Sequence, residues 1–232
     1  MKILAVETTG LIESVAVYDN GNITEINHEV KSHSAHLLKA IDKVLKKSCV
    51  KLEDLDYLAA STGPGSFIGT RIGLSTLQGL SLALNIPLVG AATLDALAEN
   101  IWDSDLDLKK INYICPLILS KDENVYAAVY IIKNNKLKRV SKYQYVSINE
   151  FLKTFRKDKI PGCIAFLGET KGFENYIIGI FGEKAFILRD KYLPRAHNIA
   201  LLAYRNIKKK KVKKTVYPSP IYVRPFLAKK MD

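Results

Sequence analysis

The order of hydrophobic and polar positions divides the chain into short strands and amphipathic helices. An apolar run at 2–6 and an alternating stretch at 13–30 predict three consecutive strands. The alternating stretch folds back at Asn20-Gly21, because both residues tolerate positive φ. Apolar residues then recur at three- and four-residue spacing from Leu37 to Leu45, which predicts a helix. Further short apolar runs and helical stretches follow, so the first half has the order β-β-β-α-β-α-β-α.

The second half repeats this order. Residues 112–120 and 124–146 predict three strands with a turn at Asn134-Asn135, and a helix follows at 147–157, begun by a capping box of Ser147 and Glu150. Strands at 163–168 and 184–189 come next, and a final helix from 194 to 211 has proline in its first turn. The repeated order predicts an α/β chain of two similar units. We divide it at 1–107 and 108–232.

Between 61 and 84 a glycine-rich turn leads into a helix with small residues on one side. The glycine spacing and the missing lysine do not match a Walker loop. A weakly indicated phosphate-binding turn stays an alternative. Each interior glycine costs about 1 kcal/mol relative to alanine. We therefore expect a second helix to pack closely here, from this chain or from a partner. The small residues are Ser66, Gly69, Gly73, Thr76, Gly79 and Ala83.

Composition narrows the class of protein. The 232 residues are 48% hydrophobic, enough for a packed core. Cys49, Cys115 and Cys163 form no CxxC pair, so neither a zinc site nor a disulfide framework is indicated. Only four consecutive apolar residues precede Glu7, too few for a signal peptide or a membrane span, so we expect a cytoplasmic protein.

The net charge of +12 is unevenly distributed. Residues 1–107 hold 8 basic and 14 acidic side chains, a net of −6, whereas residues 108–232 hold 27 and 9, a net of +18. The second half is therefore suited to face a polyanion. A solvated lysine-rich surface explains the same charge equally well.

Four segments together resemble the TsaB (YeaZ) family: ILAVETT, HSAHLL, STGPGSFIGTRIGLSTLQGLSLALNIPLVGAATLDALA and PSPIYVRP. The resemblance covers nearly the whole chain and is most specific over residues 57–98. It implies the duplicated ASKHA fold of actin, Hsp70 and sugar kinases, which is ribonuclease H-like, with two subdomains of mixed sheets flanked by helices. It also implies a partner of the related TsaD, which acts with the ATPase TsaE to place threonylcarbamoyl on the adenosine beside the tRNA anticodon.

The same resemblance implies a non-catalytic scaffold subunit. TsaD holds a metal with a histidine pair, but the corresponding segment here, AATLDALAEN, has no histidine. The glycines expected to hold phosphate in the second half are missing from LILSKDENVY. ATP or ADP and Mg²⁺ are therefore expected on the partner subunits, with no catalytic residue, metal or cofactor in this chain. The alternatives are an ATP-using ASKHA transferase and a glycoprotease-like peptidase.

The family heterodimer is made by the N-terminal half, which also offers a face for a homodimer. We assign this interface to His33, Leu37, Ser66, Gly69, Gly73, Thr76, Leu77 and Leu80. His33 and His36 lie three apart on a predicted helix, but two ligands are too few for a structural zinc site.

Two further groups complete the candidate residues. The candidates to lie near a nucleotide are Glu7, Thr8 and Thr9. Alternatively, Glu7 caps the turn that follows it or contacts Arg71. The candidates to face tRNA end the final helix, where they also suit the negative end of the helix dipole. They are Lys208, Lys209, Lys210 and Lys211.

Overall fold

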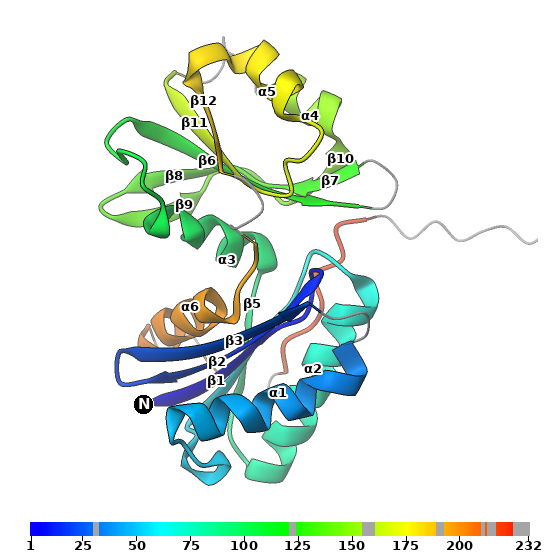
Figure 1. Ribbon diagram of the computed structural model, residues 1–232, viewed down its shortest axis with the longest axis vertical. Helices are drawn as coiled ribbons and strands as arrows, with labels where there is room; N and C mark the ends of the chain where they lie inside the picture. Colours follow the sequence, from blue (N-terminus) through cyan, green and yellow to red (C-terminus); the bar gives the residue numbers. More distant parts are fainter. Residues whose placement is uncertain are drawn as a thin grey trace, which may run out of the picture.

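Each of the two predicted repeats builds a sheet of its own in the computed structural model (Figure 1). The structure describes residues 1–29, 33–120, 124–154, 161–188, 193–209, 212 and 217–224. In the first sheet, β1 is antiparallel to β2 and parallel to β4, and the order is β3-β2-β1-β4-β5. Its strands are β1 (Lys2–Glu7), β2 (Ile12–Asp19), β3 (Asn22–Glu29), β4 (Tyr57–Ser61) and β5 (Leu88–Ala91).

The second sheet has the same arrangement in the order β10-β7-β6-β11-β12. Its central strand β6 is antiparallel to β7 and parallel to β11, and a hairpin of β8 and β9 is added beside β6. The duplication predicted from the sequence is therefore confirmed. The strands are β6 (Ile111–Leu119), β7 (Asn124–Ala127), β8 (Tyr130–Lys133), β9 (Lys136–Arg139), β10 (Gln144–Ser147), β11 (Cys163–Gly168) and β12 (Ala185–Leu188).

Helices cover both faces of the first sheet. Leu4 and Val6 of β1 pack toward α1 (His33–Ser48) and α2 (Phe67–Leu84). The alternate residues Ile3 and Ala5 pack toward α6 (Ala196–Lys208) on the other face. A strand buried on both faces has a continuous apolar sequence, which explains the run KILAV. We call the first sheet with α1, α2 and α6 the first lobe.

The second lobe is the second sheet with α4 (Ile148–Thr154) and α5 (Glu174–Phe181), which share a core with β6, β7 and β11. Helix α3 (Thr93–Glu99) lies between the lobes, because it contributes to the cores of both. Short 3₁₀ turns complete the fold at η1 (Leu52–Asp54), η2 (Asn100–Asp103) and η3 (Gly182–Lys184). Among the described residues, no helix combines the length and apolarity that a membrane crossing requires.

The second lobe differs from the sequence prediction in its strands. Residues 111–147 form five strands instead of three, because β6 pairs with β7 near its end and with β8 near its start. The chain therefore breaks between β7 and β8, where the amide of Val129 donates to Ser141 Oγ at 2.8 Å. Residues 125–132 are apolar or aromatic without interruption, so the sequence pattern did not reveal the break.

Two helix predictions also need correction. Helix α5 was not predicted, since its apolar run YIIGIF lacks a helical period. Pro194 lies outside α6, which follows Arg195 at its N-cap, so proline is not in its first turn. By contrast, the amide of Glu150 donates to Ser147 Oγ at 3.2 Å, as half of the predicted capping box requires.

Helix α6 returns from the second lobe to the first sheet, where a polar cluster anchors its start. The guanidinium Nε of Arg195 donates to Glu25 Oε2 at 2.9 Å, and the amide of His197 donates to Glu25 Oε1 at 2.9 Å. The Ala196 amide donates to Ser14 Oγ at 2.8 Å. The division after residue 107 stays a prediction, but α6, which it assigns to the second unit, packs on the first.

Removing the charge of Glu25 should loosen α6. Burial raises the pKa of Glu25, but hydrogen bonds from Arg195, His197 and Ser14 outweigh it and hold the pKa below its ordinary value. Glu25→Gln should lower the free energy of unfolding at pH 7 by about 2 kcal/mol, because bonds to a charged group are lost. Since the folded pKa is depressed, this difference should shrink as the pH falls below about 4. Urea unfolding measures it, and exposed Glu183→Gln is the control. An equal effect of both variants would contradict the anchoring role.

Candidate functional site

The end of β1 carries a fully buried carboxylate. Glu7 Oε1 accepts hydrogen bonds from the amide and the hydroxyl of Thr9, at 2.6 and 2.5 Å. Glu7 Oε2 has no hydrogen-bond partner among the described residues, and the nearby Ser61 hydroxyl does not reach hydrogen-bond geometry. Burial raises the pKa of Glu7 from 4.5 to about 7, against the opposing effect of the Thr9 hydrogen bonds. Glu7 thus holds the turn after β1, as one of the two alternatives proposed.

The assignment of Glu7, Thr8 and Thr9 to a nucleotide stays untested, yet the structure buries all three. Their exposed fractions are 0, 0 and 2%. The other alternative for Glu7, a contact with Arg71, is wrong. Arg71 instead stacks its guanidinium 3.8 Å from the centroid of the Phe67 ring and donates from Nε to the Tyr222 hydroxyl at 3.2 Å.

The small-residue side of α2 packs against the chain itself. A Cβ on Gly69 would overlap the carbonyl oxygen of Thr8, and a Cβ on Gly73 would overlap Thr8 Oγ1. The Thr8 hydroxyl also donates to the carbonyl oxygen of Gly69 at 2.8 Å. The expectation of a second helix against these glycines is therefore wrong. The segment that follows β1 makes the close approach and offsets the cost of the glycines.

The glycine-rich turn before α2 uses its amides within the chain. The Ser66 amide donates to the carbonyl oxygen of Thr9 at 2.8 Å. Ser66 in turn caps the helix, because its Oγ accepts from the Gly69 amide at 3.1 Å. A Cβ on Gly65 would overlap Thr9. These contacts within the chain explain why the turn contains glycine, and the explanation does not require a bound phosphate.

The predicted partner residues separate into buried and accessible groups. Leu37, Gly69, Gly73 and Leu77 are buried in the first lobe and present no surface, which corrects their assignment. Thr76 and Leu80 are half-buried and Ser66 is exposed. Helix α1 begins at His33, but the His33 side chain lies outside the described part of the structure. For the accessible residues the interface stays a prediction.

Exposed apolar residues that the sequence analysis missed lie on the outer sides of α1 and α2. Ile68 and Leu82 of α2 are 69 and 68% exposed, and Leu38 of α1 is 63% exposed. Positions 68, 75, 79 and 82 follow one side of the helix, and space is open above Gly79. We call Leu38, Ile68, Gly79 and Leu82 the outer face. The sequence signal that could have revealed this face is that its apolar residues fall outside the helical periodicity of the buried ones.

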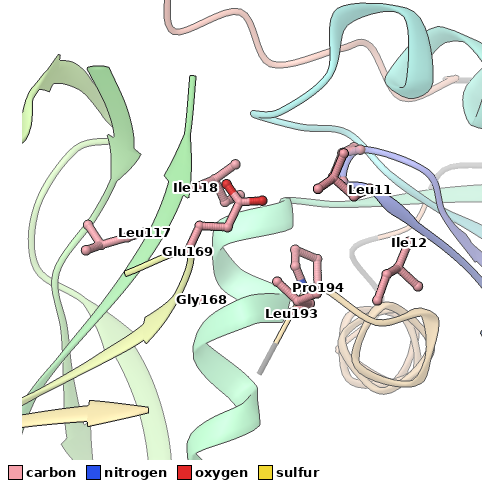
Figure 2. Close-up of a pocket in the computed structure, with 10 residues that line it drawn as sticks. Leu11, Ile12, Leu117, Ile118, Gly168, Glu169, Leu193 and Pro194 are labelled. Carbon is pink, nitrogen blue, oxygen red and sulfur yellow. The ribbon is translucent and has the colours of Figure 1, made fainter. Parts of the chain in front are cut away.

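A small pocket lies between the lobes. Figure 2 shows Ile118 and Glu169 of the second lobe facing Leu11, Ile12 and Pro194. The cavity is about 10 Å³, room for about one water. Among the described lining residues, Glu169 is the only charged one, and its Oε2 accepts from the Leu119 amide at 2.5 Å. The described lining therefore supplies no cation for a phosphate.

The lysines proposed to face tRNA are only partly described. Lys208 ends α6 with its Nζ 5.8 Å from the centroid of the Tyr204 ring, and Lys209 is the C-cap residue. Lys210 and Lys211 lie outside the described residues. The assignment of this group stays a prediction. Within the described part of the chain, no three His, Cys, Asp or Glu side chains gather as they would for a metal.

The tail at 217–224 lies on the first lobe and carries the second landmark of the resemblance. The Ile221 amide donates to the carbonyl oxygen of Thr62 at 2.7 Å, so the tail is bound to the chain just after the end of β4. The Tyr222 ring lies 5.6 Å from Phe67, centroid to centroid. A Cβ on Gly90 would overlap Pro218. The tail thereby covers the strand ends beside the start of α2.

Solved structures define the class of protein first. YeaZ from Pseudomonas aeruginosa superposes with a TM-score of 0.78, 20% identity, and coverage of 95% of this chain and 99% of that chain. The ROK hexokinase from Thermus thermophilus gives a TM-score of 0.53 at 12% identity, over 89% of this chain and 100% of that chain. With the doubled sheet order, these likenesses confirm an ASKHA-type fold.

Sequence comparison then gives the family. The family model described as "TsaD: tRNA N6-adenosine threonylcarbamoyltransferase" matches residues 24–224. The tRNA threonylcarbamoyladenosine biosynthesis protein TsaB of Bacillus subtilis is 28% identical over 87% of this chain and 86% of its own length. The TsaB of Buchnera aphidicola subsp. Schizaphis graminum is 38% identical over 58% of this chain but only 62% of its own length. The chain belongs to the family that this model describes, and within it to the TsaB (YeaZ) branch.

The glycines of α2 provide a matched test of the close approach. Gly73→Ala should lower the free energy of unfolding by about 2 kcal/mol, because the new methyl group overlaps Thr8. Combining it with Thr8→Ala should recover part of that loss. Gly79→Ala has open space and should stabilise by about 0.5 to 1 kcal/mol. Urea unfolding of the wild type and these three variants measures the differences, and similar effects at Gly73 and Gly79 would contradict the packing described.

The buried carboxylate predicts a pH dependence of stability. Because the pKa of Glu7 is raised from 4.5 to about 7 in the folded chain, its stabilising contribution is complete below pH 4.5 and is lost as the pH rises through 7. Between about pH 5 and 8 the wild type should lose about 3 kcal/mol relative to Glu7→Gln. Urea unfolding across this range checks the prediction. Parallel profiles for the two proteins would show that Glu7 does not titrate there.

Proposed function

We propose that this chain is a non-catalytic scaffold subunit that binds a TsaD relative through the outer face. With that partner and the ATPase TsaE, it would support transfer of threonylcarbamoyl to the adenosine beside the tRNA anticodon, in the cytoplasm. ATP or ADP and Mg²⁺ would be held by the partner subunits. The family role in tRNA threonylcarbamoyladenosine biosynthesis is common to the curated relatives.

The outer face is the observation that carries the proposal. Two neighbouring helices cover one side of the first sheet, and both leave large apolar side chains in solvent. Several large apolar side chains exposed on neighbouring helices favour association with another protein. Gly79 allows a partner backbone to approach α2 closely. Without a TsaD relative, the same face is available for two copies of this chain to pair.

The small pocket between the lobes supports a scaffold rather than an enzyme. Transfer of a group from ATP requires cations or amides around the phosphates. The described lining of the interlobe cavity is mostly apolar, and its one charged group is a carboxylate. An ATP-using transferase or a peptidase remains the alternative function, and turnover by the chain alone would favour it.

Charged substitutions on the outer face should separate binding from folding. Ile68→Glu and Leu82→Glu should each weaken binding to the TsaD relative by about 30-fold or more, because a carboxylate is desolvated in an apolar contact. Ile178→Glu, equally apolar and 51% exposed but on α5, is the matched control. Titration calorimetry measures the affinity, and the melting temperature reports folding.

The same variants test the function in a reconstituted reaction. Threonylcarbamoyl transfer to tRNA should fall with Ile68→Glu and Leu82→Glu, recover at high subunit concentration, and be absent when the TsaD relative is omitted. Unchanged affinity and transfer in both variants would refute the outer face as the interface. Transfer or ATP hydrolysis by the chain alone would refute the non-catalytic role.

A further inference from the structure

A second, open groove lies away from the small pocket between the lobes. It has a volume of about 780 Å³ and runs between the β9–β10 connection of the second lobe and the tail. Arg139 and Lys142 line one wall, and Tyr222 lines the other. No carboxylate is among the residues that line it: Arg139, Val140, Ser141, Lys142, Tyr143, Ile221, Tyr222 and Val223.

The charge around this groove is strongly positive. Residues 133–143 hold five basic and no acidic side chains. Arg71 reaches the Tyr222 hydroxyl from α2, and the Arg224 guanidinium lies 5.5 Å from the centroid of the Tyr145 ring. Cations therefore come from both lobes and from the tail. A groove with walls of one sign concentrates ligands of the opposite sign.

The wall that carries the cations is held in place by the fold. Ser141 Oγ accepts from the Val129 amide at 2.8 Å, so the connection is tied to the break between β7 and β8. The Tyr143 hydroxyl donates to Asp95 Oδ1 at 2.8 Å, which ties it to α3. The Arg139 guanidinium stacks on the Tyr143 ring, 3.8 Å from its centroid. The stacked Arg139 therefore has less side-chain freedom to lose when an anion binds.

Aromatic surface accompanies the charge. Tyr222 is 48% exposed and Tyr217, earlier in the tail, is 40% exposed. Cations with exposed aromatic rings are the surface that RNA strands favour, because the cations meet phosphates and the rings stack on bases. An acidic peptide would require only the cations, so the exposed aromatic rings favour RNA over an acidic peptide.

We propose that this groove binds the sugar-phosphate backbone of tRNA, with Tyr222 as a stacking surface. The proposal deepens the proposed function, on which its choice of tRNA rests. It assigns the phosphate contact to Arg139 and Lys142 in the second lobe, whereas Tyr222 on the other wall lies against Phe67, which precedes Ile68 of the outer face. The first lobe then holds the protein partner, while the groove holds the nucleic acid.

The experiment compares two pairs of substitutions of equal charge in the full chain. Arg139→Gln with Lys142→Gln removes the groove cations, and Lys153→Gln with Lys171→Gln removes two exposed lysines elsewhere in the second lobe. The probe is an unmodified, fluorescently labelled tRNA transcript. Its affinity is measured by anisotropy between about 50 and 200 mM salt, because phosphate contacts set the salt dependence.

The groove pair should weaken tRNA binding about tenfold or more at low salt and flatten the slope of log K against log salt by about 1.5 to 2. The control pair should change neither quantity appreciably. Tyr222→Leu should weaken binding about fivefold or more with an unchanged slope, because stacking carries no charge. Melting temperatures close to the wild type establish that each variant folds.

Several outcomes would refute the proposal that this groove binds tRNA. They are no tRNA binding by the wild type, equal losses in the two charge pairs, or a slope that the groove pair leaves unchanged. Weaker binding of the TsaD relative by the groove pair, with tRNA affinity intact, would make the groove a protein surface. Groove-dependent tRNA binding without any complex with the TsaD relative would support the groove while refuting the proposed function.

Discussion

The close approach of Thr8 to helix α2 is the contact on which the rest of the first lobe depends. It brings the end of the central strand against Gly69 and Gly73, where any larger side chain would overlap. The Thr8 hydroxyl bonds to the helix backbone, and the Thr9 carbonyl accepts the amide that opens the glycine turn. This contact fixes how α2 lies on the sheet. It thereby decides which α2 residues are buried and which form the outer face.

The buried Glu7 belongs to the same arrangement. A carboxylate with one unpartnered oxygen is costly in a closed core, and its pKa rises accordingly. Apolar side chains from both lobes line the small pocket beside the turn after β1 (Figure 2).

The two lobes present different chemistry to their surroundings. The first lobe exposes apolar side chains on α1 and α2, whereas the net positive charge of the chain lies in residues 108–232, which build the second lobe, α6 and the tail. Helix α6 and the tail cross back to the first lobe, and α3 contributes to both cores (Figure 1). These crossings keep the two surfaces in a fixed relation. Such a relation suits a protein that must hold a protein partner and a nucleic acid together.

The sequence by itself determined most element types and the duplicated order, because periodicity and turn residues are local signals, and its motifs indicated the family. It also marked Gly69 and Gly73 as places of close approach, since interior glycines are costly. Only the tertiary structure decided that Thr8 makes that approach, because spacing along a helix does not identify what packs against it. The break between β7 and β8, the return of α6 and the groove beside Tyr222 were likewise decided by contacts between residues far apart in the chain.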